Sequence, residues 1–401
     1  MKRFILRNGL TVLLKQKPTN SVAVEITVKV GSNNEPLKLK GISHFIEHML
    51  FEGTETRNAR ELANEIERLG GEINAFTSNE RTGYYVVVLY KHFDKALEIL
   101  ADMFHNPLFD EKMIEKERKV ILDEVNMTYD DPKIHQWYLF QELMYKKHPC
   151  RYPAYGTRKS VLNLKKDDLV KFYKENYIPN NIIISIAGNI DEKVALKKVQ
   201  EAFSKPKKTL PIRETITEPK QTKDLKKIEK RKISQSYMVY GYRTVPRGHP
   251  DSFILDVIKS ILGRGQSSKM FNEIRTKRGL AYSVGFHYEA GLDYGWVAVY
   301  AGTNKKNIKK IKEIILKEIE ELKNVSTEEL NDAINFIEGD YLLSNEDNQS
   351  IADTMVGWEM INKPELLEGY VNKIKKVKKE DIKKVVNRYF KKSAHVIIQQ
   401  V

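Results

Sequence analysis

The sequence of 401 residues contains a single cysteine, Cys150, so an intrachain disulfide and a metal site built from several cysteines are both excluded. No stretch approaches the roughly 18 consecutive apolar residues that a membrane-spanning helix needs. The apolar runs at the N-terminus are interrupted by Arg7, Asn8 and Lys15, unlike the core of a secretory signal peptide. These absences predict a cytoplasmic protein with no membrane partner.

Charge of both signs is abundant. Lys and Arg number 68 and Asp and Glu number 54, which gives a formal net charge of +14. Lys and Glu alternate along residues 305–323 and 372–392, a pattern typical of solvated helix surfaces, whereas nucleic-acid-binding proteins usually gather positive charge in one patch. We therefore expect no nucleic-acid partner, and a basic nucleic-acid-binding protein is the less favoured alternative.

Local patterns predict strands and helices in alternating groups. Apolar alternation and turn residues predict strands at residues 3–6, 10–14, 22–30, 72–78 and 84–90. Helical spacing, bounded by glycines or prolines, predicts helices at about residues 41–52, 58–69, 92–105, 111–129 and 133–145.

The chain also repeats itself. Residues 164–171 (LKKDDLVK) match residues 377–384 (VKKEDIKK), and an apolar strand pattern follows each copy. We therefore predict an α+β fold of two homologous half-domains, each a mostly antiparallel sheet packed against helices. A proline-containing segment with few large apolar residues separates the copies and predicts a linker. The expected boundaries are residues 1–203, the linker 204–226, and residues 227–401.

One cluster of residues carries chemistry. The predicted helix 41–52 contains His44, Glu47 and His48 in the order H-x-x-E-H. Residues four apart lie on one face of a helix, so both imidazoles can bind one ion, and Glu47 borders the same site. This is the inverzincin signature, in which zinc polarises the substrate and the glutamate accepts a proton. Two histidines and a glutamate are costly to bury on so apolar a helix without a cation to pair with them.

A catalytic zinc site needs a third protein ligand. The predicted helix 111–129 offers Glu115, Glu117, Asp123 and Glu124. Glu117 and Glu124 are seven residues apart and share a helix face, so one could bind the metal while the other orients a ligand. Composition alone does not rank these carboxylates.

The segments HFIEHMLFEGT at 44–54 and GGEINAFTSNERTGYY at 70–85, together with Glu117, Glu124 and the internal repeat, resemble the pitrilysin or insulinase family (M16) of zinc peptidases. The likeness covers essentially the whole chain. Within the family, the chain resembles the half-length branch of processing-protease-like enzymes and the mitochondrial processing peptidase β subunit.

The resemblance implies a role for each residue of the cluster. His44, His48 and Glu124 are expected to bind one Zn²⁺ per chain. Glu47 is expected to be the general base that acts on zinc-bound water. Glu117 is expected to support the site without binding the metal itself.

Two further segments are implied to bind substrate. Asn74 and Ala75 match the family's edge strand, on which an extended peptide pairs through its backbone. Arg275 and Tyr282, seven residues apart, match an Arg/Tyr pair: Tyr282 is expected to stabilise the oxyanion and Arg275 to hold substrate carbonyls. Arg278, four residues before Tyr282, is a rival for Arg275.

The function we predict is that of a zinc metalloendopeptidase that hydrolyses peptides or unfolded segments. The second half has SFILDVIKSILG at 252–263 in place of the metal motif, so we expect that half to be catalytically inert. The resemblance further implies a homodimer, with a heterodimer containing a metal-free homologue still open. The main alternative is a non-catalytic structural relative of the same fold.

Overall fold

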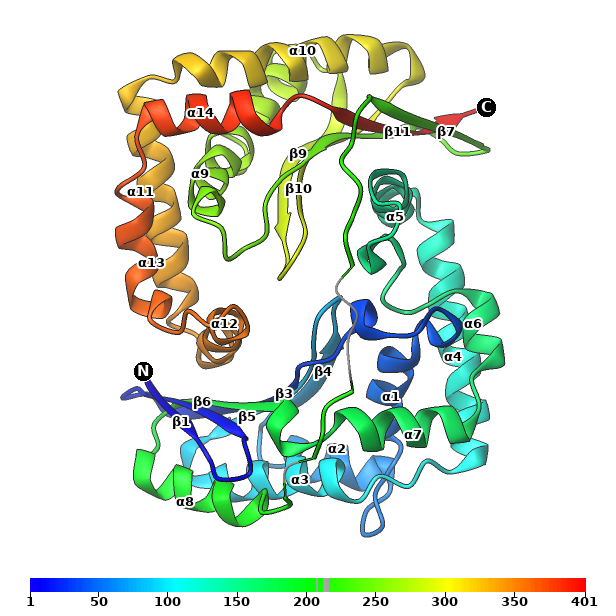
Figure 1. Cartoon of the computed structure of the whole chain (residues 1–401), viewed down its shortest axis with the longest axis vertical. Helices are drawn as coiled ribbons and strands as arrows, with labels where there is room; N and C mark the ends of the chain where they lie inside the picture. The colour runs from blue at the N-terminus through cyan, green and yellow to red at the C-terminus, as the bar shows by residue number, and fades with distance from the viewer. Residues whose placement is uncertain (207, 212–215) are drawn as a thin grey trace. The chain divides into compact units, whose positions relative to one another are not determined.

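The computed structural model describes residues 1–206, 208–211 and 216–401 (Figure 1). Part of the predicted linker 204–226, at residues 207 and 212–215, lies outside the described residues. The chain forms two compact units. The first unit consists of Met1–Met127, Tyr152–Thr215 and Ser344–Leu367, and the second of Thr128–Arg151, Ile216–Leu343 and Glu368–Val401.

The first unit contains a six-stranded sheet in the order β1-β2-β6-β3-β5-β4. Its strands are β1 (Lys2–Ile5), β2 (Thr11–Gln16), β3 (Ser21–Val28), β4 (Glu72–Thr77), β5 (Thr82–Leu89) and β6 (Ile182–Gly188). Strands β2 and β6 run parallel, and the other neighbours are antiparallel. Among the described strands, β4 pairs with β5 alone and so forms an edge of the sheet.

Helices cover both faces of this sheet (Figure 1). The helices of the first unit are α1 (Ile42–Phe51), α2 (Ala59–Glu67), α3 (Phe93–His105), α4 (Glu111–Asp130), α6 (Arg158–Asn163), α7 (Lys166–Asn176), α8 (Glu192–Ala202) and α12 (Asn348–Met360). α1 and α3 contact the sheet on one side, and α12 lies along β3 and β6. Among the described residues, no helix is both long and apolar enough to cross a membrane.

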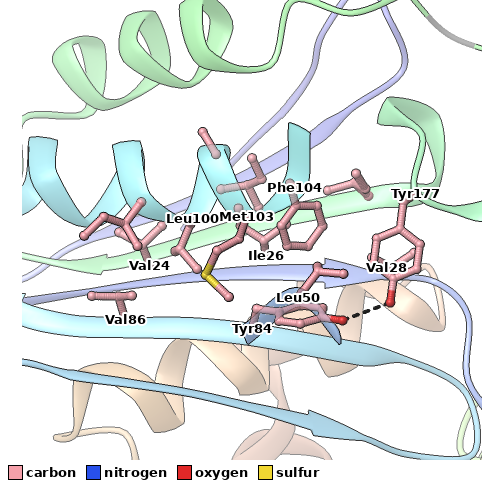
Figure 2. Close-up of a cluster of buried hydrophobic side chains, with 14 of the residues drawn as sticks. Val24, Ile26, Val28, Leu50, Tyr84, Val86, Leu100, Met103, Phe104 and Tyr177 are labelled. Carbon is pink, nitrogen blue, oxygen red and sulfur yellow. Dashed lines mark hydrogen bonds between the residues drawn. The ribbon is translucent and has the colours of Figure 1, made fainter. Parts of the chain in front are cut away.

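The main core of the first unit lies between the sheet and α3. Strand β3 alternates, so Val24, Ile26 and Val28 point into this core (Figure 2). Tyr84 of β5 is fully buried there, and its hydroxyl lies 3.0 Å from the hydroxyl of Tyr177. Apolar packing on one face of the sheet therefore fixes the frame that carries α1.

The second unit repeats this architecture with a five-stranded sheet in the order β7-β11-β8-β10-β9. Its strands are β7 (Leu225–Arg231), β8 (Ser236–Arg243), β9 (Ala281–Ala290), β10 (Gly295–Thr303) and β11 (Ser393–Gln400). Its helices are α5 (Pro132–Met144), α9 (Asp251–Gly263), α10 (Ile308–Glu321), α11 (Thr327–Ser344), α13 (Leu366–Ile374) and α14 (Lys379–Tyr389). Strand β7 is parallel to β11, as β2 is to β6.

The repeat extends to local detail, which confirms the predicted α+β fold. Asp168 accepts a hydrogen bond from the backbone N–H of Lys165 at the start of α7, at 3.0 Å. Asp381 makes the same contact with Lys378 at the start of α14, at 3.2 Å. The capping carboxylate comes three residues after the N-cap in both copies, as the repeated sequence requires.

Each unit is completed by a helix from the other half of the chain. α5 packs on β11 and β8 of the second unit, and its partner in the repeat, α12, packs on β6 and β3 of the first unit. The first of these contacts is largely apolar, with Leu139, Phe140 and Met144 in a buried cluster.

Candidate metal centre

The helix that carries the H-x-x-E-H motif is fixed at its N-terminus by a buried carboxylate. Its N-cap, Gly41, has a φ of 93°, which favours glycine. Glu35 accepts hydrogen bonds from the backbone N–H groups of Gly41 and Ser43, each at 2.8 Å. These donors have no partner within the helix, and a negative charge at this end is favourable. Burial raises the pKa of Glu35 to about 7, although Lys40 and the two N–H donors oppose that rise.

α1 presents its motif on the side away from the core. Phe45, Ile46, Met49 and Leu50 are buried in the core of the first unit. The two histidines and the glutamate of the motif are only half-buried. The apolar spacing therefore aims the motif at α4 and β4.

The side chains of His44, His48 and Glu124 converge. One potential ligand atom from each of them lies within 4.8 Å of the others. Glu124 Oε2 is 3.5 Å from His44 Nε2 and 3.7 Å from His48 Nε2. Two ligands that share one tetrahedral zinc ion are about 3.4 Å apart, since each lies near 2.0 to 2.1 Å from the metal. The donor set and spacing therefore fit a zinc ion.

The protonation of the site also suits a metal. Burial, with His48 beside it, lowers the pKa of His44 to about 3. His44 is therefore neutral at physiological pH, as a metal ligand must be. Its Nδ1 atom is buried and has no hydrogen-bond partner among the described residues.

Glu117 orients one of the histidines. Its side chain is buried, and its Oε2 atom lies 3.0 Å from His48 Nδ1. A proton on Nδ1 leaves Nε2 as the lone-pair donor facing Glu124. Of the other candidate carboxylates on α4, Asp123 is exposed and Glu115 is paired with an arginine on its own helix. The structure thus brings Glu117 and Glu124, and not the other two, to the histidines.

Glu47 is held by strand β4. Thr77, the last residue of β4, donates a hydrogen bond from Oγ1 to Glu47 Oε2 at 2.5 Å. Burial raises the pKa of Glu47, and Glu124 adds to that rise, while the bond from Thr77 and the nearby His48 lower it. Glu47 is therefore a carboxylate with raised basicity beside the candidate ligands.

The predicted substrate residues fall in both units. Asn74 and Ala75 lie on the edge strand β4, and Asn74 Oδ1 accepts a hydrogen bond from the Ala75 N–H at 2.8 Å. Arg275 and Tyr282 lie in the second unit, where the guanidinium sits over the tyrosine ring, 5.1 Å from its centroid. The rival Arg278 donates to the backbone carbonyl of Glu273 at 2.7 Å.

Comparison with known proteins identifies the family. The sequence model of the insulinase family (peptidase family M16) matches residues 11–158, and that of the peptidase M16 inactive domain matches residues 163–337. An uncharacterized zinc protease of Bacillus subtilis (strain 168) is 33% identical over 399 residues, covering 97% of this chain and 96% of its own. The chain belongs to peptidase family M16. The family resemblance predicted from the motifs is therefore confirmed.

Solved M16-fold structures show the same architecture. The crystal structure of a protease from Helicobacter pylori matches with a TM-score of 0.95 and 26% identity over 99% of both chains. A peptidase M16 inactive domain from Pseudomonas fluorescens matches with a TM-score of 0.91 over 100% of this chain and 98% of its own, at 19% identity. The second likeness concerns the fold alone, so activity in this M16 chain has to be inferred from its site.

Two residues that matter to the site were not predicted from the sequence. Glu35 lies outside the motif, and no local rule links it to the N-cap of a helix, Gly41, six residues later. Thr77 lies inside the segment that carries the family resemblance, but its contact with Glu47 spans 30 residues. Both act through tertiary contacts, which periodicity does not reveal.

Proposed function

We propose that this chain is a zinc-dependent metalloendopeptidase that hydrolyses peptides or unfolded polypeptide segments, with one zinc ion per chain. The convergence of His44, His48 and Glu124 beside Glu47 carries the proposal. Membership of the M16 family, with a Bacillus subtilis relative named a zinc protease, supports it.

Three side chains would hold the ion. His44 and His48 would each offer Nε2, and Glu124 a carboxylate oxygen. A zinc ion in such a site acts as a Lewis acid on a carbonyl oxygen and lowers the pKa of a coordinated water to near 7. Glu117 would keep the proton of His48 on Nδ1, so that the other ring nitrogen stays available.

Glu47 would transfer the protons of the reaction. We assign it the role of general base, which takes a proton from the attacking water and passes it to the leaving amine. Its pKa is raised mainly by burial, which strengthens the carboxylate as a base. A raised pKa also lets the protonated form persist long enough to serve the second transfer.

Substrate would bind by adding a strand to the free edge of β4. Backbone hydrogen bonds then supply most of the affinity, and the resulting specificity for side chains is loose. Asn74, exposed beside Ala75, would help to hold the substrate backbone. In the second unit we assign Tyr282 to the oxyanion and Arg275 to substrate carbonyls, because Arg278 is engaged with Glu273. We further propose a homodimer, by the family resemblance.

The test compares wild type with Glu47→Gln, and with Glu55→Gln as a matched control. Glu55 is exposed and lies close to the motif in sequence. Metal content and hydrolysis of a quenched fluorescent peptide are measured for each. We expect one zinc per chain in all three proteins and a loss of about 10²-fold or more in turnover for Glu47→Gln alone. A wild type that holds no zinc and cleaves nothing would favour the non-catalytic structural relative instead.

A further inference from the structure

The bond between Thr77 and Glu47 links two elements with separate roles. Thr77 ends β4, and its hydroxyl donates to Glu47 Oε2 at 2.5 Å. Hydrogen bonds to a carboxylate are shorter and stronger than those between neutral groups. Glu47 has three rotatable side-chain bonds, so one such contact removes much of its freedom while leaving Oε1 unengaged by Thr77.

Thr77 is itself held firmly. Strand β4, which Thr77 ends, is paired with β5 along its whole length. The turn is closed by Ser78, whose N–H donates to the Arg81 carbonyl at 2.8 Å. The same turn is fastened to the loop before α1 by the Ser32 N–H, which donates to the Ser78 carbonyl at 3.1 Å. The hydroxyl therefore projects from a rigid support, as a positioning group must.

Strand β4 carries both this hydroxyl and the proposed substrate edge. Asn74 and Thr77 are three residues apart, which is about 10 Å along a strand. Strand β4 would therefore position both the substrate that pairs with it and the general base Glu47. A misplacement of about 1 Å in such a group can lower the rate by roughly 10²-fold.

We infer that Thr77 is a positioning residue that orients the Glu47 carboxylate, so that the substrate-binding strand sets the direction of the general base. The inference rests on the proposed peptidase function. It assigns Thr77 no contact with the metal or with the reacting atoms. Thr77 acts through Glu47.

The test uses Thr77→Val, which removes the hydroxyl and keeps the shape, and Thr77→Ser, which restores the donor. The matched control is Thr82→Val: the buried Thr82 hydroxyl donates to the Val30 carbonyl at 3.0 Å in the same hairpin. For full-length protein we measure kcat, KM, zinc content and thermal unfolding. We expect Thr77→Val to lower kcat about 10- to 100-fold, with KM within about threefold and zinc unchanged. Thr77→Ser should recover kcat to within about threefold of wild type, and Thr82→Val should keep it within the same range.

Several results would overturn the inference. They are an unchanged kcat in Thr77→Val, an equal loss of kcat in Thr82→Val, and a Thr77→Ser variant no better than Thr77→Val. Loss of zinc from a folded Thr77→Val would point to a role in the metal site instead. A wild type without peptidase activity would refute the proposed function and this inference with it, whereas an active wild type with an unaffected Thr77→Val refutes only the inference.

Discussion

The carboxylates of α4 predict a graded loss of metal affinity along one helix. Glu124 Oε2 lies near Nε2 of both imidazoles, Glu117 contacts His48 at Nδ1, and Asp123 is exposed. Carboxamide substitutions keep the size of each side chain and remove its charge. Three substitutions therefore test three different roles. Glu124→Gln changes a proposed metal ligand, Glu117→Gln changes the hydrogen-bond partner of a ligand, and Asp123→Asn changes an exposed carboxylate that contacts neither histidine.

The size of each effect follows from these contacts. Loss of a partner behind a metal-bound histidine lowers metal affinity about 10- to 100-fold, or about 1.4 to 2.7 kcal/mol. We expect Glu117→Gln to fall in this range, near its lower end, because the amide oxygen can still accept from His48. Glu124→Gln should exceed it, since a neutral amide oxygen replaces an anionic ligand. Asp123→Asn should change affinity less than about threefold, because solvent and salt screen an exposed charge.

The assay is equilibrium competition for zinc against a chelator at neutral pH, with thermal unfolding to show that each variant is folded. Asp123→Asn is the control for charge, since it removes one negative charge next to Glu124 in sequence. Equal affinities for the Glu117 and Glu124 variants would mean that the ligand has been wrongly assigned. A large loss in Asp123→Asn would show that net charge, and not ligation, sets the affinity.

Two further predictions concern stability. Burial, with Asp353 nearby, raises the pKa of Glu25 from an ordinary value near 4.5 to about 7. The stabilisation that Glu25 contributes to the folded state is therefore fully present below about pH 4.5 and is lost as the pH rises through about 7. Glu25→Gln should therefore raise the free energy of unfolding at pH 8 by up to about 3 kcal/mol and change it little at pH 4.5. Urea unfolding of wild type and variant at both pH values checks this. A difference between the two proteins that is the same at both pH values would contradict it. Tyr84→Phe should lower the free energy of unfolding by about 1 to 3 kcal/mol, because it leaves the buried hydroxyl of Tyr177 without this partner. The double variant with Tyr177→Phe should lose less stability than the sum of the losses in the two single variants. Additive costs in the same unfolding assay would show that the two hydroxyls do not depend on each other.

Local rules predicted the elements well because most of them are strongly patterned. The strand expected at residues 72–78 is β4 at Glu72–Thr77, and the helix expected at 41–52 is α1 at Ile42–Phe51. His44 and His48 could be placed together because a spacing of four residues puts them on one helix face wherever that helix lies. These features depend on neighbours in sequence, which a single chain displays.

The remaining features depend on how elements pack. The rank of Glu124 over Asp123 is set by the rotation of α4 about its own axis against α1, and composition carries no record of that angle. The contact of Glu35 with the start of α1 is set by the path of a loop. The packing of α5 on the sheet of the second unit, and of α12 on the sheet of the first, is likewise set by tertiary contacts. An amphipathic pattern shows that a helix has an apolar face but does not show which sheet covers it.

The repeated architecture separates what the fold requires from what the chemistry requires. α1 and α9 precede equivalent edge strands, β4 and β9, in two sheets that share the order of five strands, yet α9 has no histidine or glutamate in its sequence. The frame therefore forms without the metal ligands, and the M16-fold inactive domain of Pseudomonas fluorescens matches this chain closely over its length. A likeness of fold thus fits an active and an inactive protein equally well. The case for a peptidase rests on the side chains gathered around α1, which is why substitutions there decide it.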